Sequence, residues 1–222
     1  MKKHLLLASF ALSAFLPAAS SLAADMPPVE QLRPATYDWS GAYVGGWVGS
    51  TCIDGSVTNV TTSLSYLNAG CGYKGGLLAG YNHQIDNIVL GIEADWGMSG
   101  NIVDNNQVGA DFKYGMDDIA TARFRLGYAM DDTMLFITGG GAWGRGHLTD
   151  NVSTATPTDL YGNHWGWSVG GGVEHALTDQ LRIKMDYLYT KFNDADYTAA
   201  CCNIHGGPGE DHEVRLGAIW AF

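Results

Sequence analysis

The chain has 222 residues, enough for one all-β domain once a targeting segment has been removed. It carries 12 Lys and Arg against 23 Asp and Glu, a formal net charge of −11. This balance leaves no basic stripe to meet phosphates, so nucleic acid is excluded as a partner. Glycine is abundant at 30 residues, and 7 Trp with 11 Tyr add many aromatic rings, a composition that suits closely packed strands.

The first 24 residues have the features of a secretory signal peptide. A short basic start (2–4) precedes an apolar run (5–16) and then small residues (17–24). Cleavage is expected after Ala23 or Ala24. The apolar run is shorter than the ~20 residues that a membrane-spanning helix needs. Removing the signal removes two lysines, so the mature chain has 10 basic against 23 acidic residues, a net charge of −13.

Residues 25–38 contain three of the six prolines and are expected to form an extended periplasmic leader. The remainder, 39–222, is expected to be one barrel domain. It contains eight strand-like segments: 39–50, 73–84, 88–98, 118–130, 133–144, 164–176, 180–192 and 212–222.

The connections between these segments alternate in length. Three tight turns are expected at Asp86–Asn87, Asp131–Asp132 and Thr178–Asp179, because Asp, Asn and Thr are common turn residues. The other four connections are long and polar, and are expected to be loops: 51–72, 99–117, 145–163 and 193–211. Short turns at one end and long loops at the other are typical of outer-membrane barrels.

The segment 118–130 shows the alternation most clearly. Phe124 and Leu126 share one face, and Arg123 and Arg125 share the other. In a soluble sandwich the arginines would face water, whereas in a membrane barrel the apolar face meets lipid and the charges lie inside. Strands of eleven to thirteen residues exceed the usual five or six and match the ~9–11 that cross a bilayer. The pattern therefore favours an eight-stranded antiparallel transmembrane barrel.

The interior of such a barrel is narrow, so charges there must be paired. If the strands at 88–98 and 118–130 pair with Ile88 opposite Met130, Glu93 faces Arg125 and Asp95 faces Arg123. The full set of charged residues expected to form the interior network is Glu93, Asp95, Arg123, Arg125, Glu174, Arg182, Lys184, Asp186, Glu213 and Arg215.

Five stretches resemble a known family: YDWSGAYVGGWVG (37–49), GYNHQIDNIVLGIEADWG (80–97), RFRLGYAMDDTMLFITGGGAWG (123–144), WGWSVGGGVEHALTDQLRIKMDYLYTKF (165–192) and HEVRLGAIWAF (212–222). They are similar to the small outer-membrane β-barrel proteins of alpha-proteobacteria, the porin-like family of major surface antigens. The resemblance covers nearly all of the mature chain except the expected loops.

The resemblance implies an up-and-down barrel in the Gram-negative outer membrane, in contact with lipid and lipopolysaccharide, with its tight turns in the periplasm and its loops outside the cell. It implies recognition by the barrel-assembly machinery through the last strand, which ends on Phe222 with Trp220 two positions before it. Members are abundant envelope proteins, and a few bind haemin or contact host surfaces. His83 and Trp47 depart from the usual family pattern, as do the four cysteines.

The cysteines are Cys52, Cys71, Cys201 and Cys202, all in the first and last expected loops. Export through an oxidising compartment predicts disulfides, with three possible connectivities. A Cys52–Cys71 bond with an adjacent Cys201–Cys202 pair is preferred, and bonds between the two loops remain the alternative.

Two segments carry residue types that occur in chemical sites. The stretch 201–212 offers two thiols with His205 and His212, but it lacks a repeated metal-ligand spacing, so no metal or cofactor is expected. A hydrolytic triad is disfavoured too, because Ser168 and Glu174 would face inward and His175 outward. His147 and His164 are interpreted as residues at the bases of loops. The chain is therefore not expected to be an enzyme.

The sequence predicts a structural envelope component and surface antigen with little or no pore activity. The alternative is a ligand-binding or adhesive protein whose loops contact haemin or a host surface. A third class, a soluble periplasmic barrel that holds a small ligand, would require the opposite orientation of the faces.

Overall fold

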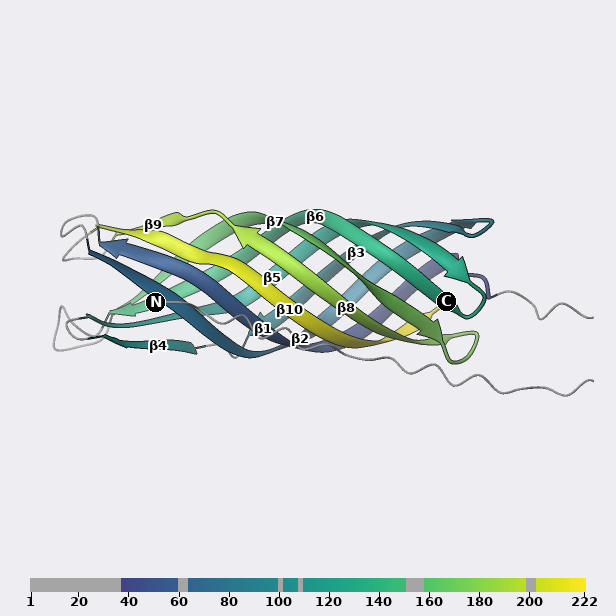
Figure 1. Ribbon diagram of the computed structural model, residues 1–222, viewed down its shortest axis with the longest axis horizontal. Helices are drawn as coiled ribbons and strands as arrows, with labels where there is room; N and C mark the ends of the chain where they lie inside the picture. The colour runs from purple at the N-terminus through teal and green to yellow at the C-terminus, as the bar shows by residue number, and fades with distance from the viewer. Residues whose placement is uncertain (1–36, 60–63, 100–101, 108–109, 151–157, 199–202) are drawn as a thin grey trace, which may run out of the picture. The chain divides into compact units, whose positions relative to one another are not determined.

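The computed structural model describes residues 37–59, 64–99, 102–107, 110–150, 158–198 and 203–222. These residues form one antiparallel sheet that closes on itself (Figure 1). Within them, no helix is long and apolar enough to span a membrane. The strands are β1 (Gly41–Asn59), β2 (Leu64–Ile85), β3 (Ile88–Ser99), β4 (Ile102–Gln107), β5 (Ala110–Met130), β6 (Thr133–Asp150), β7 (Thr158–Ala176), β8 (Leu181–Phe192), β9 (Ala195–Thr198) and β10 (Asn203–Ala221).

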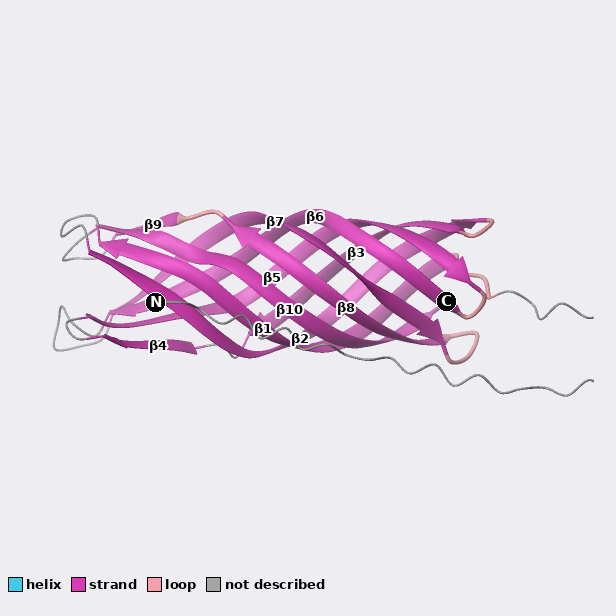
Figure 2. Cartoon of the chain, in the orientation of Figure 1, coloured by secondary structure: helices cyan, strands magenta, loops and turns pink. Residues whose placement is uncertain are grey.

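The barrel wall has eight strand positions around its circumference, called staves below, as predicted. Two of these positions are each occupied by two successive strands, so the chain has ten strands in all among the described residues. The long strands pair in the order β1-β2-β3-β5-β6-β7-β8-β10, and β1 pairs with β10 to close the cylinder. The short strand β4 follows β3 and pairs with the same partner, β5, while β9 follows β8 and pairs with β10. Each short strand therefore continues the stave before it (Figure 2).

The tight turns lie where the sequence predicts them. Two of them contain a residue in the left-handed region, Asp86 with φ of 55° and Asp131 with φ of 52°. Aspartate tolerates this conformation better than most residues because its short side chain bonds locally. Both turns are two residues long and lie at one end of the barrel.

The prediction of four long loops at the other end is wrong over much of their length. The β1–β2 ladder continues without a break to Asn59 opposite Leu64, so the segment 51–72 is mainly a hairpin extension. The β5–β6 ladder likewise begins at Phe112 opposite Asp150. These segments lack apolar alternation because they extend beyond any lipid-facing zone. Their backbone N–H and C=O groups nevertheless form hydrogen bonds with the neighbouring strand.

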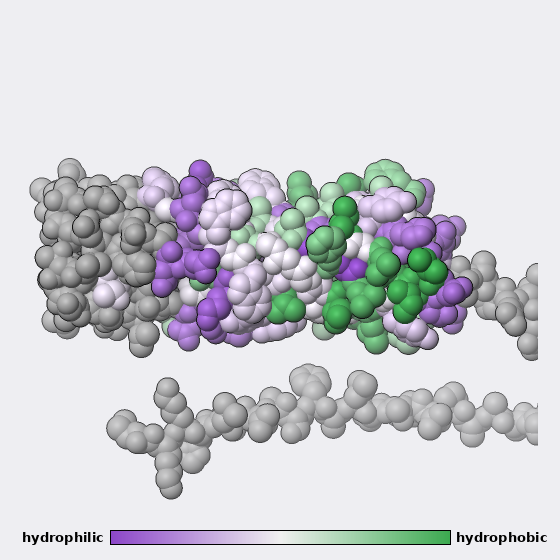
Figure 3. Space-filling model, turned by 90° about the horizontal axis from the view of Figure 1, so that it is seen from above, coloured by the Kyte–Doolittle hydropathy of each residue, from purple (hydrophilic) through white to green (hydrophobic). Residues whose placement is uncertain are grey.

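The two faces of each stave meet different surroundings. Phe124 is 76% exposed and faces outward, whereas the neighbouring Arg123 is 3% exposed and faces inward. Similar alternation runs along β3 and β8. Figure 3 shows hydrophobic side chains, in green, gathered toward the turn end of the barrel, with hydrophilic side chains, in purple, on either side of them.

The predicted register between the staves at 88–98 and 118–130 is wrong by two residues. Ile88 lies opposite Tyr128, not Met130, so Glu93 faces Arg123. Strand ends in a barrel are staggered by the shear, and the prediction had placed them level. A shift of two residues keeps every side chain on its own face, so the inward set is unaffected.

Candidate functional site: the charged barrel lumen

Among the residues that the structure describes, twelve buried Lys, Arg, Asp and Glu residues face the lumen, meaning the space enclosed by the eight staves. Ten of them are the residues that the sequence predicts. Lys74 and Asp211 were missed, although Asp211 shares the period-two series of Glu213 and Arg215 and so carried a usable signal. Six residues of each sign make the set neutral: Lys74, Arg123, Arg125, Arg182, Lys184 and Arg215 against Glu93, Asp95, Glu174, Asp186, Asp211 and Glu213.

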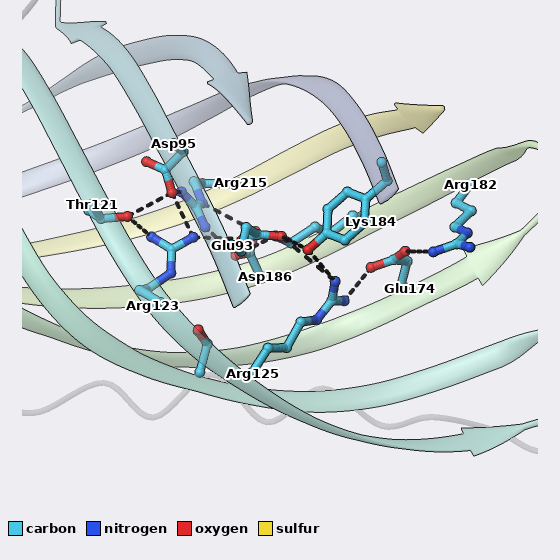
Figure 4. Close-up of polar contacts among 12 residues, drawn as sticks. Glu93, Asp95, Thr121, Arg123, Arg125, Glu174, Arg182, Lys184, Asp186 and Arg215 are labelled. Atoms are coloured by element: carbon cyan, nitrogen blue, oxygen red, sulfur yellow. Dashed lines mark hydrogen bonds and ion pairs between the residues drawn. The ribbon is translucent and has the colours of Figure 1, made fainter. Parts of the chain in front are cut away.

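Glu93 on β3 occupies the centre of the network (Figure 4). Its carboxylate accepts hydrogen bonds from Arg123 on β5 at 2.7 Å and from Lys184 on β8 at 2.6 Å. The hydroxyl of Tyr43 on β1 donates to it at 3.0 Å, and Arg125 lies 3.7 Å away. One carboxylate thus ties together four staves.

A second cluster lies beside Asp95. Arg123 contacts Asp95 at 2.6 Å, and the Thr121 hydroxyl donates to the same carboxylate at 2.8 Å. Arg215 on β10 connects Asp95 at 3.4 Å with Asp186 at 2.5 Å. The arginines therefore bridge carboxylates from different strands, which satisfies several of their donors at once.

Toward the turns, Glu174 on β7 pairs with Arg125 and, at 3.4 Å, with Arg182. The Arg125 guanidinium lies 3.9 Å from the centre of the Phe136 ring. Toward the opposite end, Lys74 pairs with Asp211 and lies 3.5 Å from Glu213. Charged contacts therefore follow the lumen along its length.

A hydrophobic floor closes the lumen at the turn end, and sequence reasoning missed it. Trp39, two residues before β1, is fully buried and packs in one cluster with Val89, Ala129, Met134, Phe136 and Ala176. Its indole N–H donates to the Asp131 carbonyl at 3.3 Å. Trp39 is the first residue of the segment 39–50, which the sequence predicts to be a strand, and its large apolar ring was the one available signal of burial.

Tyr37 fastens the same segment to the network. Its hydroxyl accepts a hydrogen bond from Arg182 Nε at 2.6 Å and donates to the Asp179 carbonyl at 3.0 Å. Next to it, the Ser40 backbone N–H donates to Asp38 at 2.9 Å and holds the pKa of that carboxyl below its ordinary value. Residues 37–40 are thus bound to the barrel end.

The remaining predicted sites fall in different places. Cys52 and Cys71 lie directly opposite each other on β1 and β2 and form a disulfide bond. Cys201 and Cys202 lie outside the described residues, as do Ala23 and Ala24. Among the residues that the structure describes, no group of three or more His, Cys, Asp or Glu is arranged to hold a metal ion.

The histidines are dispersed around the barrel. His212 faces outward and accepts or donates a 2.7 Å hydrogen bond with the Tyr187 hydroxyl. His147 contacts Asp117 at 2.8 Å, and His175 contacts Thr133 at 2.9 Å. His164 is buried, with its Nδ1 atom 3.0 Å from the Asn193 carbonyl oxygen.

Ser168 and Glu174 face the lumen, as expected for their strand. Of the two positions that depart from the family pattern, His83 is exposed and Trp47 lies in the lumen with the Arg215 guanidinium 5.0 Å from its ring centre. At the end of β10, Trp220 and Phe222 face outward, and the Phe222 N–H donates to the Ala42 carbonyl at 3.0 Å.

The charged side chains of the lumen are paired with one another. Each charge has a partner of opposite sign within the described network, and separating a buried pair leaves an uncompensated charge at a cost of about 3–5 kcal/mol. The network therefore holds its side chains in place across the lumen.

Comparisons with known proteins agree with this architecture. A family model described as "Outer membrane protein beta-barrel domain" matches residues 8–222. The 31 kDa outer-membrane immunogenic protein of Brucella melitensis is 30% identical, covering 92% of this chain and 95% of its own. The 25 kDa outer-membrane immunogenic protein of Brucella abortus is 28% identical, with coverage of 99% and 98%.

Among solved structures, the outer membrane protein OprG from Pseudomonas aeruginosa is similar in fold. The TM-score is 0.53 at 11% sequence identity, and the match covers 82% of this chain and 97% of OprG. At this level of identity the likeness concerns the fold alone.

Proposed function

The chain belongs to the outer membrane protein beta-barrel family, and from its filled lumen we propose that it is a structural component of the outer membrane with little or no pore activity. Family membership and the outer-membrane relatives place the protein in that membrane, where its outward apolar side chains meet lipid. The proposal concerns what it does there.

The observation that carries the proposal is the neutral set of twelve buried charges above the Trp39 floor. An eight-stave barrel is just wide enough for side chains to fill, whereas aqueous porins have about sixteen strands. Because Glu93 alone connects four staves, the network also braces the cylinder from within. Such a barrel strengthens the membrane without opening it.

The structural role also implies how the protein is exported, inserted and oriented in the outer membrane. The signal peptide ending at Ala23 or Ala24 directs export, and the periplasmic side holds the tight turns and residues 25–38. Trp220 and Phe222 at the end of β10 present aromatic rings to the barrel-assembly machinery. Lipopolysaccharide contacts the outer half of the wall. The protein acts without catalysis, and its exposed extensions serve as surface antigens.

Two measurements test the structural role. The mature chain refolded into planar bilayers should give no step-like currents of porin size. A strain lacking the gene should leak periplasmic enzyme and become sensitive to detergent, and a chain with the hairpin tips shortened should restore the barrier. Porin-like currents, or full barrier function in the deletion strain, would contradict the proposal.

A surface-binding role is the second candidate, in which the extensions contact haemin or a host surface. It is favoured by the length of the ladders, which continue well beyond the expected membrane zone to Asn59 and Leu64. Haemin titration of the refolded protein, followed by the absorbance of the haem, tests whether the extensions bind haemin. Binding of labelled cells to host matrix, with and without the hairpin tips, tests the other.

A further inference from the structure

Beyond the membrane zone two of the ladders of the barrel end before the others. The ladder of β2 with β3 ends at Lys74 opposite Ser99, while β2 continues toward the loop end in its ladder with β1; β4 lies near β2 but forms no ladder with it. The ladder of β7 with β8 ends at Gly166 opposite Phe192, and one further backbone hydrogen bond runs from the Asn193 N–H to the Trp165 carbonyl at 2.8 Å, while β7 continues in its ladder with β6. The ladders that continue follow the order β2-β1-β10-β9 on one side and β4-β5-β6-β7 on the other, and the hydrogen bond between Asn193 and Trp165 joins the two groups.

The early end of the β2–β3 ladder leaves the upper half of β2, Leu64–Tyr73, as an edge. In the part of the chain that the structure describes, β1 is the one strand that pairs with these ten residues. Figure 1 shows β4 and this half of β2 separating toward the loop end of the barrel. Backbone N–H and C=O groups along an edge of this kind are a template for another strand.

The edge lacks the features by which proteins normally protect such strands. The sequence LSYLNAGCGY (64–73) contains no charged residue and no proline. The ladder with β1 runs through it without a bulge. Lysine, proline and bulges are the usual protections, and small residues such as those at 69–72 let a second backbone approach closely.

The disulfide strengthens this edge at the point where it begins. Cys71 lies three residues beyond the last β2–β3 pair and is bonded to Cys52 on the one neighbouring strand. The bond keeps the β1–β2 ladder together where support from β3 is lost. An edge that is rigid before binding loses less conformational freedom when a partner docks.

We propose that the β2 edge, Leu64–Tyr73, captures an extended cationic polypeptide segment by strand addition. Strand addition supplies main-chain hydrogen bonds from the edge and leaves side chains to set specificity. The charge of the partner follows from the surrounding segments. Apart from the buried Asp211, the segments 51–72, 99–118, 145–163 and 191–211 carry ten Asp and Glu against three Lys and Arg.

A second copy of the chain in the same membrane fits this edge poorly. Two barrels in one bilayer are related by an axis along the membrane normal, and staves tilt by roughly 35–45°. Their β2 edges would cross at about twice that tilt instead of running alongside each other. The proposal goes beyond the structural role of the barrel and does not depend on whether the lumen conducts.

The test uses the full mature chain in lipid nanodiscs and a fluorescent twelve-residue peptide of repeated Lys-Thr-Val. A matched peptide carries N-methyl groups on alternate amides, which keeps its charge and removes half of its backbone donors. We expect the unmodified peptide to bind at least tenfold more tightly. Amide hydrogen exchange at residues 64–73 should slow when the unmodified peptide is added.

Two variants with the same added charge locate the site. Ala69→Lys places a protecting lysine on the edge, and Ser50→Lys places one on β1, which is paired on both sides. Ala69→Lys should weaken binding at least fivefold and Ser50→Lys no more than twofold. Equal binding of both peptides, equal effects of both variants, or protection confined to other strands would overturn the proposal, as would protection at 64–73 through self-association without peptide.

Discussion

Replacing Glu93 with Gln distinguishes a dry, filled lumen from a hydrated one. The substitution keeps the size of the side chain and removes a charge that Arg123 and Lys184 contact at 2.7 and 2.6 Å. The Glu93 side chain is 2% exposed, so water cannot replace the lost partner. The positive charges of Arg123 and Lys184 would then be only partly neutralised by the remaining carboxylates.

The size of the effect follows from burial. Removing one partner of a buried pair costs about 3–5 kcal/mol, whereas an exposed pair is worth about 0.2–1 kcal/mol. Each cation around Glu93 keeps a second carboxylate, as Arg123 does with Asp95 at 2.6 Å. We therefore expect Glu93→Gln to lower the free energy of unfolding by about 3 kcal/mol, the lower end of this range. Adding Lys184→Met to Glu93→Gln should recover part of this loss, because it restores the charge balance.

The assay is reversible urea unfolding in lipid vesicles, followed by tryptophan fluorescence and by the gel shift that folded barrels show before boiling. Asp118→Asn is the matched control, because Asp118 pairs with Arg145 at 2.7 Å at a site where the Arg145 side chain is 49% exposed. It should cost less than about 1 kcal/mol. A Glu93→Gln cost as small as that of the control would refute the dry lumen and the structural role built on it.

Three further perturbations probe other parts of the barrel. Trp39→Ala should lower the free energy of unfolding by about 3–5 kcal/mol and admit small ionic currents in planar bilayers, because it removes the floor of the lumen. Gly97→Ala should cost about 1–3 kcal/mol in the same urea assay, because its new methyl group would lie 2.6 Å from the Trp47 ring. Replacing Cys52 and Cys71 together by Ser should cost up to about 3 kcal/mol and speed proteolysis within 52–71, and an unchanged cleavage rate there would argue against the stapling role.

The sequence was sufficient to predict which side chains face the lumen and which face outward, but not the register between neighbouring staves. Alternation around Arg123 and Arg125 predicts which side chains point inward, because the side-chain period of a strand is two. It does not specify the offset between neighbours, which depends on the closure of all eight staves. Glu93 accordingly faces Arg123 and not Arg125, while both arginines remain close to it.

Other parts of the lumen were missed for physical reasons that can be named. Lys74 and Asp211 lie where apolar alternation fades, since their staves leave the lipid zone there and the outward face no longer needs to be hydrophobic. Trp39 precedes the first strand, and its burial depends on residues from β3, β5, β6 and β7 that meet only when the cylinder closes. No local pattern records such a contact.

The sharing of each lumen carboxylate among several staves constrains how this protein can diverge. A substitution of Glu93 removes contacts to β1, β5 and β8 at the same time. We therefore expect such a substitution to persist in a lineage only together with a compensating change on another stave. Outward positions such as Phe124 meet fluid lipid and can exchange one apolar residue for another independently. Among descendants of a common barrel, the inside should therefore evolve as correlated sets and the outside residue by residue.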